Sequence, residues 1–174
     1  MTEEIGTLDN AAADRPPPSA LETGGRTVPG EWIDYNGHMM DAYYSLAFTE
    51  ATDSLLDYLG LGAGYTERSG CGIYTVESHI CFLASARGGD QLRYASQLLD
   101  YDAKRLRVFH RITLPSGSDA ATNELMFLHV DLAAERVTPM PQDRFSAVAG
   151  LASRHAVLPV PGPAGRRIAM PRRT

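Results

Sequence analysis

A short polar run between positions 34 and 41 contains the groups best suited to chemistry on a carbonyl carbon. Asp34 supplies a carboxylate, Gly37 and His38 follow closely, and Asp41 stands where a helical pattern begins. A carboxylate can attack a carbonyl directly or activate water, and the residues alone do not decide between these routes. The first amides of a helix lack intrahelical partners and lie at its positive end, so they can stabilise an oxyanion. A carboxylate beside such amides would suit chemistry on a carbonyl group at the helix start, although an Asx turn is the favoured interpretation of Asp34 taken alone.

Each of these residues also has a structural interpretation. Asp34 could shape an Asx turn, although the complete motif favours a catalytic role. His38 could orient a substrate or stabilise Asp34, and it could equally brace the loop by bonding to the backbone. Asp41 is a candidate N-cap, which is compatible with a second role for its backbone N–H as an oxyanion donor.

The motif leads directly into the one long helix that the sequence predicts, over residues 41–59. Gly60 is suited to end it. The apolar residues of one face recur at steps of three and four, which is typical of a helix with one buried side: Tyr44, Phe48, Ala51, Leu55 and Leu59. Such a broad apolar stripe indicates that this helix lies against a sheet.

Extended segments are expected on both sides of this helix. In residues 74–82 the period changes to two, because Tyr74, Val76, Ile80 and Phe82 alternate with more polar residues. Short turn-like breaks separate the later segments, so neighbouring strands should be antiparallel. The predicted segments are 26–33, 74–82, 91–100, 105–114 and 120–131. This order predicts an α+β layer pair in which an antiparallel sheet wraps around one helix.

The length of 174 residues suits one domain with tails. Residues 1–24 contain three consecutive prolines and no apolar period, so they are interpreted as a mobile leader. Residues 25–141 are the expected folded domain. Residues 142–174 are expected to form a short helix at 142–153 and then an arm rich in proline and arginine.

Composition excludes several classes of protein. The net charge is −5, with 10 basic and 21 acidic residues at positions 1–143 and six arginines with no acid at positions 144–174. The acidic body argues against nucleic-acid binding. No apolar run reaches bilayer length and no signal sequence is recognisable, so a cytoplasmic protein without a membrane partner is expected. Cys71 and Cys81 are interpreted as reduced thiols. His110 and His129 lack metal-ligand spacing, so neither a metal nor another cofactor is expected.

The segment 34–44 resembles the signature of the 4-hydroxybenzoyl-CoA thioesterase branch of the hotdog superfamily, in which an aspartate stands three residues before a glycine and an aromatic-rich helix follows. The resemblance continues through 76–82, 89–93 and 129–141. Thioesterases associated with carnitine dehydrogenase, which hydrolyse betainyl-CoA, are a closer match around 31–44, 74–80, 101–106 and 155–167. The resemblance implies a hotdog fold, an acyl-CoA substrate and hydrolysis without a cofactor.

By the same resemblance, the backbone N–H of Asp41 is the favoured oxyanion donor, and Gly37 lets the acyl group approach the backbone. The chain departs from the family pattern at Met40, where the family usually has an asparagine, because methionine cannot hydrogen-bond as an amide does. This departure keeps open a non-catalytic, acyl-CoA-binding protein. An aromatic or fatty acyl-CoA thioesterase is the alternative among enzymes.

A betainyl group carries a positive charge that cannot be hydrogen-bonded, so aromatic rings or a carboxylate would recognise it. Trp32 and Tyr35 lead because they flank Asp34, although packing in the core or an interface is the alternative for each ring. The aromatic candidates for substrate binding are Trp32, Tyr35, Tyr43, Tyr44 and Tyr74.

Two further groups of polar residues are candidates. Glu77 and His79 lie two apart on a strand and so share a face, which is either solvated or part of a composite site across a dimer interface. Lys104, Arg105 and Arg107, beside a strand turn, could contact CoA phosphates or simply aid solubility, and the same choice applies to Arg166 and Arg167. An open sheet edge predicts a homodimer with a continuous sheet, or a homotetramer.

Overall fold

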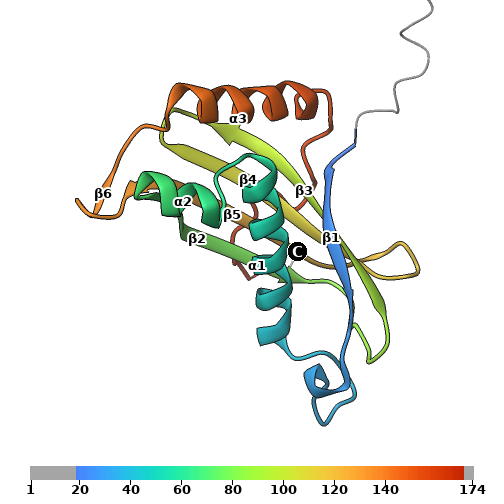
Figure 1. Ribbon diagram of the computed structural model, residues 1–174. Helices are drawn as coiled ribbons and strands as arrows, with labels where there is room; N and C mark the ends of the chain where they lie inside the picture. Colours follow the sequence, from blue (N-terminus) through green and yellow to red (C-terminus); the bar gives the residue numbers. More distant parts are fainter. Residues whose placement is uncertain (1–18, 171–174) are drawn as a thin grey trace, which may run out of the picture.

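A six-stranded antiparallel sheet curls around one long helix in the computed structural model, which describes residues 19–170 (Figure 1). The strand order is β1-β3-β4-β5-β2, and β6 pairs with β5. The elements in chain order are β1 (Leu21–Thr27), a 3₁₀ turn η1 (Gly30–Trp32), α1 (Asp41–Tyr58), α2 (Ala63–Ser69), β2 (Cys71–Phe82), β3 (Gln91–Tyr101), β4 (Arg105–Thr113), β5 (Asp119–Asp131), β6 (Arg136–Val137) and α3 (Gln142–His155). The predicted α+β layer pair is confirmed.

Helix α1 buries the stripe that its sequence predicts, including Tyr44, Phe48 and Leu55. It ends before Gly60, whose φ of 68° is the left-handed conformation that favours glycine. The N-cap residue is Met40, so the prediction of Asp41 as N-cap is wrong. Asp41 is instead the first helical residue.

Strand β2 contains a bulge that the alternating pattern did not predict. Its register with β5 shifts between Thr75 and Glu77, so Val76 is the extra residue. A bulge moves every later side chain to the other face. Tyr74 therefore lies on the same face as Glu77, whereas an unbroken strand would place it on the opposite face.

Three boundaries differ from the prediction. Strand β1 begins at Leu21, within the predicted leader, whose residues 1–18 lie outside the described part of the chain. The glycine-rich connection after α1 contains the short helix α2. Helix α3 buries Val148 and Leu151 among core residues of α1 and the sheet, although the sequence placed it beyond the domain. Its burial shows that the core extends to this helix.

A chain of hydrogen bonds crosses the core between the sheet and α1. The Nδ1 atom of His110 lies 2.6 Å from the Ser96 hydroxyl, and its Nε2 atom lies 3.0 Å from the Thr52 hydroxyl. Ser96 in turn bonds to the Thr23 hydroxyl at 2.9 Å. Burial lowers the pKa of His110 to about 3 because the charged form would be desolvated. His110 is thus a neutral core residue.

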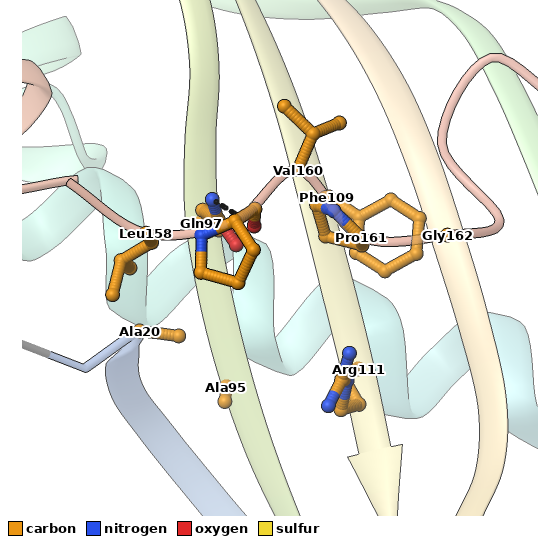
Figure 2. Close-up of a pocket in the computed structure, with 10 residues that line it drawn as sticks. Ala20, Ala95, Gln97, Phe109, Arg111, Leu158, Val160, Pro161 and Gly162 are labelled. Carbon is orange, nitrogen blue, oxygen red and sulfur yellow. Dashed lines mark hydrogen bonds between the residues drawn. The ribbon is translucent and has the colours of Figure 1, made fainter. Parts of the chain in front are cut away.

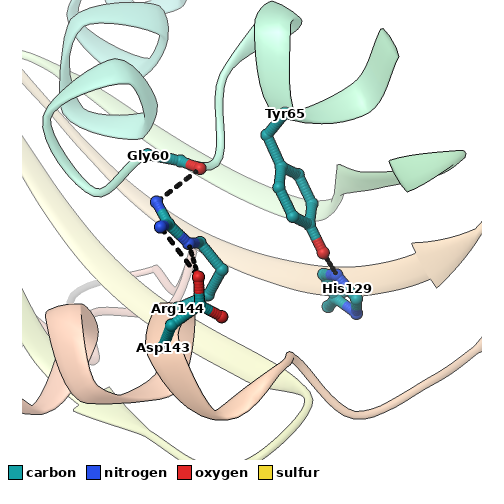
Figure 3. Close-up of polar contacts among 5 residues, drawn as sticks. All are labelled: Gly60, Tyr65, His129, Asp143 and Arg144. Atoms are coloured by element: carbon teal, nitrogen blue, oxygen red, sulfur yellow. Dashed lines mark hydrogen bonds and ion pairs between the residues drawn. The ribbon is translucent and has the colours of Figure 1, made fainter. Parts of the chain in front are cut away.

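A second set of polar contacts fixes the helices that follow α1 (Figure 3). Tyr65 of α2 bonds through its hydroxyl to Nε2 of the buried His129 at 2.8 Å, and the Nδ1 atom of His129 lies 2.9 Å from the Thr138 carbonyl oxygen. Arg144 of α3 donates to the Gly60 carbonyl at 3.1 Å. These contacts are structural and lie at the end of α1 away from the 34–41 loop, as Figure 1 shows.

Candidate active site

The Asp34 side chain organises the loop that precedes α1. Its Oδ1 accepts the backbone N–H groups of Asn36 at 2.8 Å and His38 at 3.2 Å, and its Oδ2 accepts the Asn36 side-chain amide at 3.2 Å. The Asp34 N–H donates to the His38 carbonyl at 2.9 Å, which closes the turn. Asp34 therefore forms the Asx turn that was one of its two interpretations. The turn also holds the carboxylate in a fixed position at a half-buried site.

The charge of Asp34 is stabilised by this turn. Partial desolvation raises its pKa, but the hydrogen bonds from His38 and Asn36 outweigh that effect, so the pKa lies below its ordinary value of 3.8. Asp34 is consequently an anion throughout the neutral range. Such a group is available for nucleophilic attack or for accepting a proton from water.

The first backbone amides of α1 differ in whether they have partners. Asp41 Oδ1 accepts the Ala42 N–H at 2.8 Å, and the Met40 carbonyl accepts the Tyr43 N–H at 3.0 Å. The Asp41 N–H has no hydrogen-bond partner among residues 19–170. An unpaired donor at a helix N-terminus is the kind of group that can bind an oxyanion.

Backbone contacts hold the loop without the family asparagine. Met40 N–H donates to the Trp32 carbonyl at 2.9 Å, and Met39 N–H donates to the Ala86 carbonyl at 2.9 Å. Gly37 has a φ of 77°, and a Cβ there would meet nothing within 4 Å, so the turn conformation explains this glycine. Methionine at position 40 thus leaves the loop anchored at both ends.

His38 braces the loop through its main chain. Its N–H and carbonyl both bond to Asp34, whereas its imidazole makes no hydrogen bond within the described part of the chain. The ring is half-buried and close enough to Asp34 for their charges to interact. It remains a candidate for orienting a substrate.

Three of the five candidate aromatic residues, Trp32, Tyr43 and Tyr44, already contact other groups of the protein. Trp32 and Tyr43 are stacked, with ring centroids 4.8 Å apart and planes within 7°. The Arg26 guanidinium lies 4.8 Å from the Trp32 ring centroid and is paired with Glu50 at 3.0 Å. A stacked tyrosine and a guanidinium thus take the faces of this indole.

Tyr44 is buried and acts as a link to the neighbouring loop. Its hydroxyl donates to the Ala84 carbonyl at 3.3 Å and accepts the Ala86 N–H at 3.0 Å. Burial raises the pKa of this phenol. Tyr35 is the opposite case, because 98% of its surface is exposed beside Asp34. Among the candidates that flank Asp34, Tyr35 is the ring with open faces.

The remaining candidates lie away from Asp34 within one chain. Tyr74, Glu77 and His79 project from the face of β2 that is turned away from α1, as their register with β5 shows. Within one chain, Glu77 and His79 therefore lie on a solvated face of the sheet. A second subunit would have to cover this face to form the composite site.

The three basic candidates stand at the β3–β4 turn, near the end of β3 opposite to the Asp34 loop. Arg105 pairs with Asp102 at 2.5 Å, and Arg107 pairs with Glu124 at 2.6 Å. Lys104 makes no ion pair within the described residues. Because β3 has 11 residues and a strand rises about 3.3 Å per residue, this turn lies roughly 30 Å from the loop. Within a single chain these cations do not meet Asp34.

Two of the hollows in this fold lie on opposite faces of the sheet, and a further one of about 270 Å³ lies at the β3–β4 turn, where Arg105 and Arg107 line it. A groove of about 370 Å³ runs between α1 and the inner face of β2 and β5, and it is lined by Ser45, Phe48, Ile80 and Asn123 among others. A second cavity of about 450 Å³ lies on the other face of the sheet, where the C-terminal arm crosses β3 and β4 (Figure 2). There Gln97 donates to the Pro159 carbonyl at 3.3 Å. Only the groove begins near the loop, one helical turn beyond Asp41.

The sequence analysis did not single out the segment between β2 and β3. Residues 83–90 lie against the Asp34 loop through the Ala86 contact, and they bring Arg87 to this end of the molecule. Phe82 is 55% exposed and packs edge-on against Tyr44, with centroids 5.4 Å apart. The periodic pattern could identify Phe82 as a strand residue but gave no sign that its end of β2 borders the loop.

Comparison with known proteins places this geometry in a family. Residues 28–149 match the model of the thioesterase-like superfamily. The chain belongs to the thioesterase-like superfamily. This thioesterase-like chain is 42% identical over 152 residues to a betainyl-CoA thioesterase of Pseudomonas aeruginosa, with 87% of the chain and 96% of that relative covered.

Other relatives agree with this membership. A fused L-carnitine dehydrogenase/betainyl-CoA thioesterase of Agrobacterium fabrum is 46% identical over 114 residues, which are 66% of the chain and 23% of that larger protein. A Staphylococcus aureus protein solved in complex with CoA superposes with a TM-score of 0.82 at 28% identity, covering 87% of this chain and 97% of its own. The predicted hotdog thioesterase family and fold are confirmed.

Neither a metal site nor a membrane helix accompanies the loop in the described residues. No cluster of three or more histidine, cysteine, aspartate or glutamate side chains within residues 19–170 could hold a metal ion. None of the helices there is long and apolar enough to cross a bilayer.

Proposed function

We propose that this chain hydrolyses the thioester of betainyl-CoA to betaine and CoA. The observation that carries the proposal is that one short loop presents both an ionised carboxylate, on Asp34, and a backbone N–H without a hydrogen-bond partner in residues 19–170, on Asp41 at the start of α1. The betainyl assignment is supported by the 42% identity to the Pseudomonas aeruginosa enzyme over nearly its whole length.

In this reaction the Asp41 N–H binds the thioester oxygen as it gains negative charge. Asp34 either attacks the carbonyl carbon, which expels CoA thiolate and leaves an anhydride for water to hydrolyse, or accepts a proton from the water that attacks. Both routes consume one water and release a carboxylate and a thiol. His38 and Tyr35 border the acyl group and are the proposed contacts beside it.

Thiol release from a panel of CoA esters tests the proposal. We expect kcat/KM to be highest for betainyl-CoA and lower for aromatic and long-chain esters, because the site carries two carboxylates and so favours a cationic acyl group. The panel is measured with purified protein at constant ionic strength. Equal kcat/KM values for betainyl-CoA and palmitoyl-CoA would contradict the betainyl assignment.

A second candidate is an aromatic or fatty acyl-CoA thioesterase. The groove between α1 and β2 favours it, because its opening at Ser45 lies one turn beyond Asp41 and its walls include Phe48 and Ile80. An acyl group longer than betainyl would extend into this space. The same panel separates the two functions.

We propose a homodimer formed through strand β2. This strand is an edge of the sheet, and it exposes Tyr74 and Val76 by more than half of their surface. Antiparallel pairing of two such edges would satisfy their backbone groups and cover the groove. It would also bring Glu77, His79 and the basic β3–β4 turn to the neighbouring subunit, where they could contact acyl-CoA. A homotetramer would add a second interface.

Sedimentation equilibrium measures this assembly directly. We expect a species of at least twice the chain mass of 18.9 kDa. The variant Val76→Lys should shift it towards monomer, since burying two unpaired ammonium groups in the interface is costly. A matched change on the opposite edge, Glu22→Lys in β1, should leave the dimer intact. A monomeric wild-type protein would contradict the proposal.

The proposed place of the reaction is the cytoplasm. The free thiols of Cys71 and Cys81 support a reducing compartment.

A further inference from the structure

The charge of the acyl group restricts which residues can recognise it in the proposed reaction. One methylene separates the carbonyl carbon of a betainyl group from its quaternary nitrogen, which therefore lie about 2.5 Å apart. If the carbonyl oxygen accepts the Asp41 N–H, the ammonium lies within about 6 Å of that nitrogen. Asp53 is an acidic residue that lines the groove, but it is roughly 18 Å farther along α1, because a helix rises about 1.5 Å per residue. Within one chain, the groups near enough to reach the cation belong to the loop, the first helical turn and the adjoining segment 83–90.

Aromatic rings supply little of this recognition. The Trp32 ring already contacts the Arg26 guanidinium and the Tyr43 ring. Tyr44 is buried, and its hydroxyl accepts the Ala86 N–H. Tyr35 is open, but its 98% exposure means that no residue of the same chain holds its ring in place. A carboxylate held in place by the same chain is therefore the stronger partner for the cation.

The Asp41 carboxylate is held where this cation would be. Its Oδ1 is fixed by the Ala42 N–H at 2.8 Å, and its Oδ2 has no partner within residues 19–170. Neither Asp41 nor Asp34 forms an ion pair in the described part of the chain, and the nearby Arg26 is committed to Glu50. The start of α1 thus presents two carboxylates that have no ion-pair partner within residues 19–170.

We propose that the Asp41 side chain is the specificity-determining group for a cationic acyl moiety. A carboxylate beside the oxyanion donor raises the energy of the developing negative charge, so it slows the hydrolysis of neutral acyl groups. An ammonium in the substrate offsets this repulsion. The same side chain therefore selects for the cation and against uncharged competitors. This inference rests on the proposed function and adds the residue that sets its selectivity.

A pair of isosteric substrates tests the role of charge alone. In 3,3-dimethylbutanoyl-CoA a carbon atom replaces the quaternary nitrogen of betainyl-CoA, so shape is retained and charge is lost. We expect Asp41→Asn to lower kcat/KM for betainyl-CoA about tenfold, which is about 1.4 kcal/mol. For the neutral ester kcat/KM should stay constant or rise. The ratio of the two values should therefore fall at least tenfold.

The matched control is Glu67→Gln in α2, which removes one exposed negative charge at the other end of α1 and should leave the ratio unchanged. Asp41→Ser repeats the test if asparagine disturbs the helix start, and thermal unfolding monitors both variants. If the ratio is unchanged in both Asp41 variants, or both substrates lose rate equally, the inference is overturned while the proposed function stands. If wild type itself shows no preference for betainyl-CoA, the proposed function fails instead.

Discussion

Replacing Asp34 by asparagine is expected to reduce kcat for thioester hydrolysis about 10³-fold. An amide can neither form an anhydride with the acyl group nor accept a proton from water at neutral pH. Its oxygen can still accept the N–H groups of Asn36 and His38, so the turn should persist. Thiol release under saturating substrate gives kcat, and circular dichroism with thermal unfolding checks the fold.

The chain contains a matched control for this change. Asp131 closes a turn after β5 in the same manner, since its Oδ1 accepts the N–H groups of Ala133 at 3.1 Å and Ala134 at 3.0 Å. Asp131→Asn should leave kcat unchanged. If Asp34→Asn also kept the wild-type rate, Asp34 would have no part in the mechanism.

Acidification should destabilise the fold through His110. Its pKa is about 3 in the folded protein and 6.5 when exposed, so the unfolded chain takes up the proton first as the pH falls. The stabilising contribution of the neutral ring is complete above pH 6.5 and is lost as the pH falls towards 3. The expected loss at pH 4.5 is roughly 3 kcal/mol. Burial also lowers the pKa of His155, which acts in the same direction.

Urea unfolding at pH 7 and pH 4.5 measures this loss in wild type and in two variants. His110→Gln cannot titrate, so the difference in unfolding free energy between the two pH values should shrink. Ser96→Ala removes the partner of Nδ1 but leaves the histidine buried, so it should lower stability at both pH values and keep the difference. An undiminished difference in His110→Gln would assign the acid sensitivity to other groups.

The sequence was sufficient to predict the central helix and the antiparallel pairing of β3, β4 and β5, because both depend on local patterns; the pairing of β2 with β5 and of β1 with β3 was not predicted. The stripe from Tyr44 to Leu55 is strong, and short breaks between strands leave little choice but antiparallel neighbours. The bulge at Val76 depends on pairing with β5, a contact distant in sequence, so no local pattern reveals it. Helix α3 was predicted close to its observed bounds, but its packing on the core was missed for the same reason, because it depends on contacts with the sheet and α1.

The candidate site was predictable where a motif carried it. The segment from Asp34 to Asp41 is contiguous, so its turn and the helix start follow from residue types alone. The aromatic candidates were harder to judge, because the sequence does not show that the Arg26 guanidinium lies over the Trp32 ring. The sequence also did not show how far the basic candidates lie from Asp34. The β3–β4 turn is basic, yet the length of β3 separates it from Asp34 within one chain.

The two hydrogen bonds of the Tyr44 hydroxyl have a consequence for any attempt to redesign substrate choice. They connect a core residue of α1 to the main chain of the segment that borders the Asp34 loop. Exposed side chains of that segment can change, but Ala86 is fully buried and the backbone path is fixed by the contacts with the helix. Grafting a loop of another length would break these hydrogen bonds and leave the buried Tyr44 hydroxyl without a partner. Point substitutions at Arg87 would not have this effect.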